Sequence, residues 1–329
     1  MNNTPQEIWD RISKANKILQ VHDKRFDFDA LCSALLMKSV IERKLGKSVD
    51  IIYTGELAYN AKDIVDVSPV KENTDISSVD LGKYDLVIVT DCGEEGHMSS
   101  EIGFELTSDI DLINIDHHSG NSFYGILNYV KQYGSACTVL VELFMHLDIE
   151  LTEPEKTLVA TGIVTDTSFM SFDTTTAEDL RYLADLLENG LDYKGIIQKL
   201  KIGRSWDDLM LNKIVLSHLV LDEGGEYAYS YFTLEELANE KIDLGKVIVR
   251  HVDNFKSLSG VKFVFCVAEE GEGKFAVSFR ASDLKFSVLE LGQAFGGGGR
   301  EAAAAGVIQA KDITEAIELV RSKLRELNV

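Results

Sequence analysis

Three adjacent residues that can bind a metal ion follow a short apolar segment of this chain. Asp116, His117 and His118 stand directly after residues 112–115, whose branched side chains predict a buried strand. Carboxylate oxygens and imidazole nitrogens suit Mn²⁺ or Mg²⁺, and a mixed set of the two favours Mn²⁺. The triplet therefore predicts a metal site at the end of a strand.

Other residues of the same types also follow apolar segments. They come after residues 18–21, 86–90 and 161–165, and they are His22, Asp27, Asp29, Asp91 and Asp166. A single Asp in such a place is more often a helix N-cap or a turn former. A set of this size is rarely without function, and the carboxyl ends of parallel strands meet at one edge of a sheet. We therefore expect one metal cleft there.

Asp91 has the position expected of a carboxylate shared by two metal ions. Two ions a few ångströms apart need such a bridge, and together they clamp both oxygens of an in-line displacement at phosphorus. Phosphoester hydrolysis is the chemistry that this set predicts. The remaining histidines do not stand near other metal-binding residue types at the end of a predicted strand. They are interpreted as structural or surface residues: His97, His146, His218 and His251.

The length, net charge and apolar content of the chain limit which molecules such a site could bind. The chain has 329 residues, enough for two domains, and a net charge of −21. This charge repels long nucleic acids, whereas a short anionic substrate held by metal ions remains compatible with it. The four cysteines lie far apart, and no segment is apolar enough to span a membrane. We expect a cytoplasmic protein with reduced thiols and no membrane partner.

Strand and helix signals alternate in the first half of the chain. Residues 29–45 have helical apolar spacing and end at Gly46, and short branched segments separate the helical ones. The alternation predicts an α/β fold, an N-terminal doubly wound parallel sheet joined by a helical connector to a smaller α/β C-terminal domain. The expected boundaries are 1–201 for the metal-binding domain, 202–225 for the connector and 226–329 for the second domain.

The predicted metal-binding residues, in their order along the chain, resemble the four motifs of the DHH phosphoesterases. They are His22, Asp27, Asp29, Asp91, Asp116, His117, His118 and Asp166. Residues 278–282, SFRAS, and 295–306, FGGGGREAAAAG, resemble the DHH-associated C-terminal domain. Within that superfamily the chain is most similar to the oligoribonucleases that degrade nanoRNA and also dephosphorylate 3′-phosphoadenosine 5′-phosphate (pAp). The resemblance spans about residues 17–310.

The resemblance implies a role for each residue of the set. One Mn²⁺ would be held by His22, Asp27 and Asp91, and the other by Asp29, Asp91, His117 and Asp166. Asp116 would orient a ligating histidine, and His118 would contact the scissile phosphate or help to protonate the leaving oxygen. In the second domain the substrate-binding residues would be Arg280, Gly296, Gly297, Gly298, Gly299 and Arg300.

The chain departs from the family pattern at two places. Asp27 and Asp29 stand five and seven residues after His22, one more than is usual, so a bulge must absorb the extra residue or His22 misses the metal. Arg300 replaces the histidine that normally follows the glycines, and arginine cannot titrate near pH 7. Taken alone, the glycines would indicate a plain flexible turn, and Arg280 a surface charge.

The predicted metal cleft and the family resemblance together imply a function. It is Mn²⁺-dependent hydrolysis of short oligoribonucleotides, linear dinucleotides or pAp, by two-metal in-line attack of water. The alternatives are a catalytically weak nucleotide-binding protein and a pyrophosphatase-like enzyme. Mg²⁺ is a second candidate ion. The sequence leaves open the preferred substrate and base, the direction of digestion and the oligomeric state, although dimers are common among relatives.

Overall fold

The computed structural model describes residues 1–24, 27–55, 57, 60–106, 110–202, 205–244, 247, 251–283 and 285–327. The chain forms two compact units, Met1–Gly203 and Arg204–Val329, each with hydrophobic cores of its own. No helix within the described ranges is both long and apolar enough to cross a membrane.

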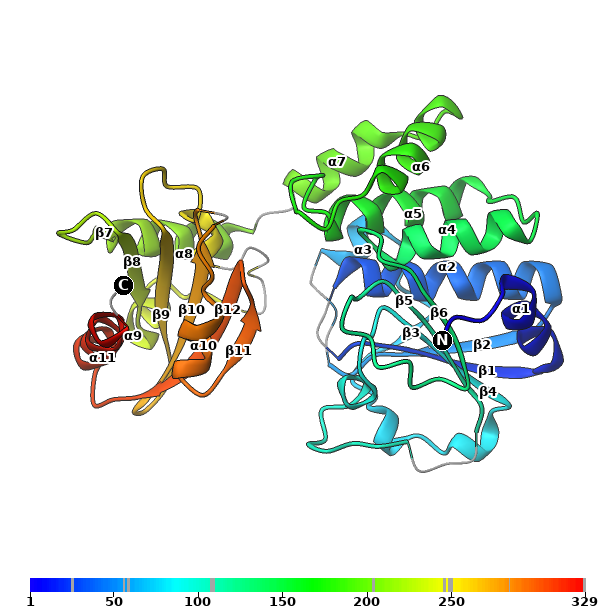
Figure 1. The fold of residues 1–329 in the computed structure, drawn as a ribbon, viewed down its shortest axis with the longest axis horizontal. Coiled ribbons are helices and arrows are strands. Elements are labelled where there is room, and N and C mark those ends of the chain that lie inside the picture. Colours follow the sequence, from blue (N-terminus) through cyan, green and yellow to red (C-terminus); the bar gives the residue numbers. More distant parts are fainter. Residues whose placement is uncertain are drawn as a thin grey trace. The chain divides into compact units, whose positions relative to one another are not determined.

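The first unit is built on a parallel sheet of six strands in the order β3-β2-β1-β4-β5-β6 (Figure 1). The strands are β1 (Lys17–His22), β2 (Ser48–Ile52), β3 (Val70–Lys71), β4 (Leu86–Thr90), β5 (Leu112–Asp116) and β6 (Leu127–Val130). The strand order reverses between β1 and β4, and open α/β sheets bind ligands at the carboxyl end of such a switch point. The predicted α/β fold with an N-terminal parallel sheet is confirmed.

Helices cover one face of this sheet, and short 3₁₀ helices cover the other. The helices are α1 (Pro5–Lys14), α2 (Phe28–Leu45), α3 (Ala61–Ile64), α4 (Ala136–His146), α5 (Glu153–Asp166), α6 (Ala177–Glu188) and α7 (Tyr193–Ile202). The 3₁₀ helices are η1 (Ile76–Ser78), η2 (Leu81–Lys83) and η3 (Glu95–Met98). Because both faces are covered, strands such as β4 are buried throughout, which explains their unbroken apolar sequence.

The predicted limits of α2 agree with the structure. Asp27 is the N-cap and accepts a hydrogen bond from the backbone N–H of Asp29. Gly46 closes the helix with φ 65°, a left-handed conformation that glycine adopts without strain. Asp27 and Asp29 are therefore fixed at the start of a long buried helix.

The second unit contains a sheet in the order β11-β12-β10-β9-β8-β7 (Figure 1). Its strands are β7 (Val220–Leu221), β8 (Tyr227–Phe232), β9 (Phe263–Gly271), β10 (Lys274–Ala281), β11 (Gly298–Arg300) and β12 (Ala303–Gln309). Its helices are α8 (Trp206–Ser217), α9 (Leu234–Asn239), the 3₁₀ helix η5 (His251–Asn254), α10 (Leu289–Ala294) and α11 (Ile313–Glu326). Neighbouring strands are antiparallel except β8 and β9.

The segment 202–225, predicted to be a helical connector, contains α8 and β7. α8 buries Leu211, Ile214 and Val215 in a core cluster with residues of β8 and β9. The helix is therefore an integral part of the second unit.

Candidate metal centre

Two carboxylates converge on the imidazole of His117 at the carboxyl edge of the first sheet. Its Nε2 lies 3.1 Å from Oδ1 of Asp91 and 3.3 Å from Oδ2 of Asp166. Its Nδ1 lies 3.0 Å from the backbone oxygen of Tyr133, which can only accept, so Nδ1 carries a proton. Burial lowers the pKa of His117, but the hydrogen bond and charge of Asp91 outweigh it and hold that pKa well above its usual value. Nε2 is therefore directed at a site that attracts positive charge.

Asp91 has an unusual backbone conformation. It follows β4 with φ 55°, in the left-handed region that non-glycine residues rarely adopt. Its backbone N–H donates to the carbonyl of Ile115 on β5. A strained residue held in place by neighbouring strands is typical of functional sites, and here it lies next to the switch point.

Asp29 is completely buried and is held by the start of α4. Its two carboxylate oxygens accept from the backbone N–H groups of Ala136, at 2.5 Å, and Cys137, at 3.1 Å. Burial and the charges of Asp91 and Asp166 raise the pKa of Asp29 well above its ordinary value. Burial and Asp91 likewise raise the pKa of Asp27 to about 6. Crowded buried carboxylates of this kind are stabilised by a bound cation.

Asp166 is the last residue of helix α5. The apolar residues 161–165 belong to a longer helix that begins at Glu153. Burial raises the pKa of Asp166 to about 7. Gly162, one helical turn earlier, brings α5 close to Asp29, since a Cβ there would lie 2.4 Å from Oδ1 of Asp29.

His22 ends β1 as a buried imidazole with one nitrogen available. Its Nδ1 lies 3.0 Å from the backbone oxygen of Asp23, and its ring stacks on Tyr53 with centroids 5.1 Å apart. Its Nε2 is buried without a hydrogen-bond partner among the described residues. Burial lowers the pKa of His22, which favours the neutral form that binds metals. An orphaned buried nitrogen of this kind fits a metal ligand. Arg25 and Phe26, which hold the extra residue of spacing, lie outside the described residues.

The Asp116 carboxylate forms a hydrogen bond with His118. Its Oδ1 lies 2.8 Å from Nδ1 of His118, and its Oδ2 accepts from the side chain of Asn121 at 2.6 Å. The hydrogen-bond partner of Nδ1 of His117 is the Tyr133 carbonyl, and that of Nδ1 of His118 is Asp116. The amino-acid sequence could not reveal the contact between His117 and Tyr133, because the backbone oxygen of Tyr133 makes it and every residue type has such an oxygen. His118 has 45% of its side chain exposed, and its pKa, lowered by burial, is raised overall by Asp116.

The donor set as a whole fits divalent cations. Asp29, His117 and Asp166 have ligand atoms within 4.8 Å of one another, and so have Asp91, Asp116, His117 and His118. Hard carboxylate oxygens together with imidazole nitrogens are the ligands of Mn²⁺ and related ions. The structure therefore brings Asp29, Asp91, His117 and Asp166 together, with Asp27 close enough for Asp91 to raise its pKa.

Arg280, in the second unit, is buried and forms hydrogen bonds through two of its nitrogen atoms. Its Nε donates to Oδ1 of Asp253 at 3.0 Å, and its Nη1 donates to the carbonyl of Phe279 at 2.9 Å. Arg280 and Arg300 both pair with Ala303, on opposite sides of β12. Directly opposed residues point to the same face of a sheet, so the two arginines flank one alanine on one face.

The predicted glycine loop is packed closely against β12. A Cβ on Gly297 would lie 1.9 Å from the carbonyl oxygen of Ala305, and one on Gly299 would lie 2.3 Å from that of Ala303. Gly296 has φ 68°, and a Cβ on Gly298 would meet nothing within 4 Å. The loop is thus closely packed rather than a free turn, and Gly298 leaves its backbone open on one side.

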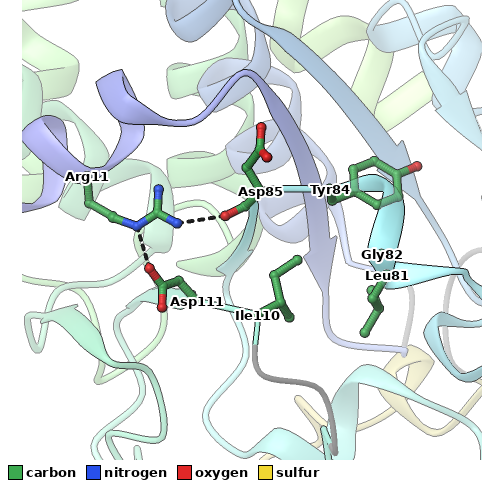
Figure 2. A pocket seen from close by; sticks show the side chains of 7 residues that line it. All are labelled: Arg11, Leu81, Gly82, Tyr84, Asp85, Ile110 and Asp111. Atoms are coloured by element: carbon green, nitrogen blue, oxygen red, sulfur yellow. Dashed lines mark hydrogen bonds and ion pairs between the residues drawn. The ribbon is translucent and has the colours of Figure 1, made fainter.

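A pocket of about 480 Å³ lies at the other edge of the first sheet (Figure 2). Asp85 and Asp111 line it, and they directly precede β4 and β5, so it lies at the amino ends of the strands. Its Arg11 donates to the carboxylate of Asp111 and to the backbone oxygen of Asp85, both at 2.6 Å. That positive charge is already neutralised, and the pocket is remote from the residues of the metal centre.

Two family models match consecutive parts of the chain. Residues 17–163 match the DHH family, N-terminal domain, and residues 224–326 match the DHHA1 domain. The chain therefore contains a DHH-family N-terminal domain and a DHHA1 domain. The first match includes His22, Asp91 and His117, and the second includes Arg280 and Arg300.

Several curated relatives are similar to this chain. It is 27% identical to the uncharacterized protein MJ1633 of Methanocaldococcus jannaschii, over 92% of this chain and 62% of the relative. It is 31% identical to the bifunctional oligoribonuclease and PAP phosphatase NrnA of Thermus thermophilus, over 65% of this chain and 64% of the relative. It is 25% identical to a probable manganese-dependent inorganic pyrophosphatase of an Exiguobacterium species, over 72% of this chain and 74% of the relative. The chain thus spans less than two thirds of the first two.

A solved structure shares the fold. The exopolyphosphatase-related protein of Bacteroides fragilis superposes with a TM-score of 0.83 at 20% identity, covering 98% of this chain and 96% of that one. The similarity extends over both units and confirms the predicted fold class.

Proposed function

We propose that this protein is a metal-dependent phosphoesterase that uses Mn²⁺. The supporting observation is the imidazole of His117 within hydrogen-bond distance of two carboxylates, beside the completely buried Asp29. Such a cluster of negative charge is stable in a folded protein when a cation compensates it. The residues proposed to hold two ions are His22, Asp27, Asp29, Asp91, His117 and Asp166. Similarity to manganese-dependent relatives supports the choice of ion.

What divalent cations supply when bound is positive charge against the oxygens of a phosphoryl group. The chain's own residues complete the chemistry. Asp116 holds Nδ1 of the half-exposed His118 side chain at 2.8 Å, so its Nε2 is the nitrogen that can give a proton to a leaving oxygen. In the second unit, Arg280 and Arg300 offer guanidinium groups for the phosphates of the substrate.

The proposed substrates are short nucleotides: RNA dinucleotides, nanoRNA or pAp. A net charge of −21 disfavours the extended basic groove that long nucleic acids require, whereas two arginines suffice for a substrate with few phosphates. Similarity to NrnA supports this class. Pyrophosphate is the second candidate, and it is favoured by the similarity to the manganese-dependent pyrophosphatase.

The experiment is a substrate panel with the purified chain. Release of phosphate or mononucleotide is measured from pAp, from a 5′-phosphorylated RNA dinucleotide and from pyrophosphate, each with Mn²⁺ and with EDTA. The proposal predicts Mn²⁺-dependent turnover of the dinucleotide or of pAp that exceeds turnover of pyrophosphate. Turnover of pyrophosphate alone would select the second candidate. Tight nucleotide binding with no turnover on any substrate would contradict the enzyme and indicate a nucleotide-binding protein.

A further inference from the structure

The turn between β6 and α4, residues 131–135, contacts more than one proposed metal ligand. Its Tyr133 carbonyl accepts from Nδ1 of His117 at 3.0 Å. The helix that it starts donates to both oxygens of Asp29 through the N–H groups of Ala136 and Cys137. A shift of this turn would therefore move a histidine and an aspartate of the metal centre together.

Asp179 fixes the turn from a distant helix. It lies in the first turn of α6 and is completely buried. Its carboxylate accepts from the backbone N–H of Gly134, at 3.0 Å and 3.2 Å, and from the hydroxyl of Thr138 at 2.5 Å. The partners are thus the turn itself and the first turn of α4. These hydrogen bonds satisfy the oxygens of a completely buried carboxylate.

Gly134 is enclosed between Asp179 and a third part of the centre. A Cβ at Gly134 would lie 2.5 Å from Oδ2 of Asp179 and 2.7 Å from the methyl group of Thr167, which directly follows Asp166. The turn therefore fits tightly between the carboxylate of Asp179 and the end of α5. Any displacement of Asp179 would be transmitted to the backbone of the turn.

The same carboxylate also caps its own helix. Its Oδ2 accepts from the N–H and the hydroxyl of Thr176, both at 2.7 Å, in a capping box. Capping stabilises α6, while the contacts with Gly134 and Thr138 hold the turn. The two roles use different partners, so they can be separated by mutation.

We propose that Asp179 is a positioning residue of the metal centre. By fixing the 131–135 turn, it sets the orientation of the His117 ring through Tyr133 and the placement of Asp29 through the N-terminus of α4. Partners of metal-binding side chains influence affinity strongly, and their loss typically weakens binding about ten- to a hundredfold. This inference rests on the proposed function, since it concerns ligands of the proposed Mn²⁺ ions.

The test measures the Mn²⁺ dissociation constant by electron paramagnetic resonance titration of the metal-free full chain. Asp179→Asn and Thr138→Val should each bind Mn²⁺ roughly tenfold or more weakly than the wild type. Thr176→Ala is the matched control, because it removes the hydroxyl from the capping box, while the Gly134 N–H and the Thr138 hydroxyl still bond to Asp179. It should lower the melting temperature and leave Mn²⁺ affinity unchanged. If Asp179→Asn does not fold, Thr138→Val carries the comparison.

Two outcomes would overturn the inference while leaving the proposed function intact. One is wild-type Mn²⁺ affinity in folded Asp179→Asn and in Thr138→Val. The other is an equal loss of affinity in Thr176→Ala, which would reduce Asp179 to a helix cap. Failure of the wild type itself to bind Mn²⁺ is a distinct result, because it would contradict the proposed function and with it this inference.

Discussion

At the residue scale, the proposed centre is a set of carboxylates that the fold buries at an electrostatic cost. The pKa of Asp27 is raised to about 6 and that of Asp166 to about 7, in both cases chiefly by burial. Raised carboxyl pKa values mean that the charged forms are unfavourable in the absence of a cation. His117 and His22 supply the nitrogens that complete a Mn²⁺-type donor set.

His22 gives the first prediction, because its Nε2 is buried without a described partner. His22→Gln should weaken Mn²⁺ binding roughly tenfold or more, since a ligand is at least as important as the residues around it. The measurement is calorimetric titration of Mn²⁺, with His146→Gln as control, because 61% of that side chain is exposed. Unchanged affinity would show that the extra residue before Asp27 has removed His22 from the centre.

Arg300, the residue that departs from the family pattern, gives the second prediction. Arg300→Ala should raise KM for a 5′-phosphorylated dinucleotide about ten- to a hundredfold and leave kcat nearly unchanged, because a charge-assisted hydrogen bond contributes about 1.5–3 kcal/mol. Steady-state kinetics distinguish the two parameters. Arg325→Ala, on α11, serves as control because Arg325 pairs with Glu318. A fall in kcat at constant KM would contradict a binding role.

At the element scale, α2 and α5 together determine the spacing of the carboxylates. α2 begins with Asp27 and Asp29, and α5 ends with Asp166. The two helices are joined by Glu155, a completely buried residue that accepts from Arg43 at 2.8 Å and from Ser39 at 2.8 Å. Glu155 also forms the capping box of α5 with Thr152.

The ion pair of Glu155 predicts how stability depends on pH. Burial raises the pKa of Glu155, but Arg43 and Thr152 outweigh it and lower that pKa below its ordinary value of 4.5. A lowered pKa in the folded state means that the stabilisation is present above pH 4.5 and is lost as the pH falls through the folded pKa. Glu155→Gln should unfold about 1–3 kcal/mol more easily at pH 7, and its stability should fall less below pH 4.5.

Urea denaturation at several pH values measures this difference. Glu153→Gln is the matched control, because Glu153 starts the same helix and 66% of its side chain is exposed. Parallel pH profiles for Glu155→Gln and the wild type would show that the ion pair does not contribute.

Gly162 tests how closely α5 must approach the centre. The new methyl group of Gly162→Ala would lie 2.4 Å from both Oδ1 of Asp29 and Sγ of Cys137. Relieving this overlap should cost about 1–3 kcal/mol of stability and displace Asp29, which weakens Mn²⁺ binding. Thermal unfolding and Mn²⁺ titration check both effects against Gly271→Ala, where a Cβ meets nothing within 4 Å. A variant as stable as the wild type would contradict this packing.

The sequence predicts the elements well where the pattern is local. The strand at 86–90 and the end of α2 at Gly46 follow from apolar runs and capping rules, and the structure has them in those places. A short apolar run such as 161–165 is by itself ambiguous between helix and strand, and the structure has it inside α5. Contacts made by backbone atoms or between distant segments, such as Tyr133 with His117 and Asp179 with Gly134, leave no local signal.

At the scale of the whole molecule, the two units have separate cores and differ in the charge of their proposed functional residues. These residues are mainly acidic in the first unit and basic in the second. The first unit gathers acidic and imidazole groups at the carboxyl edge of a parallel sheet. The second places Arg280 and Arg300 on either side of Ala303. This division fits a protein whose first unit holds cations and whose second binds phosphates, within a chain of net charge −21.

The most direct test of this account is the number of Mn²⁺ ions bound per chain, measured by equilibrium dialysis of wild type and Asp91→Ala. Because Asp91 is the carboxylate proposed to bridge the ions, the wild type should bind two and the variant should retain none at the same free Mn²⁺. A wild type that binds no Mn²⁺, or an Asp91→Ala variant that binds as much as the wild type, would contradict the proposed metal centre.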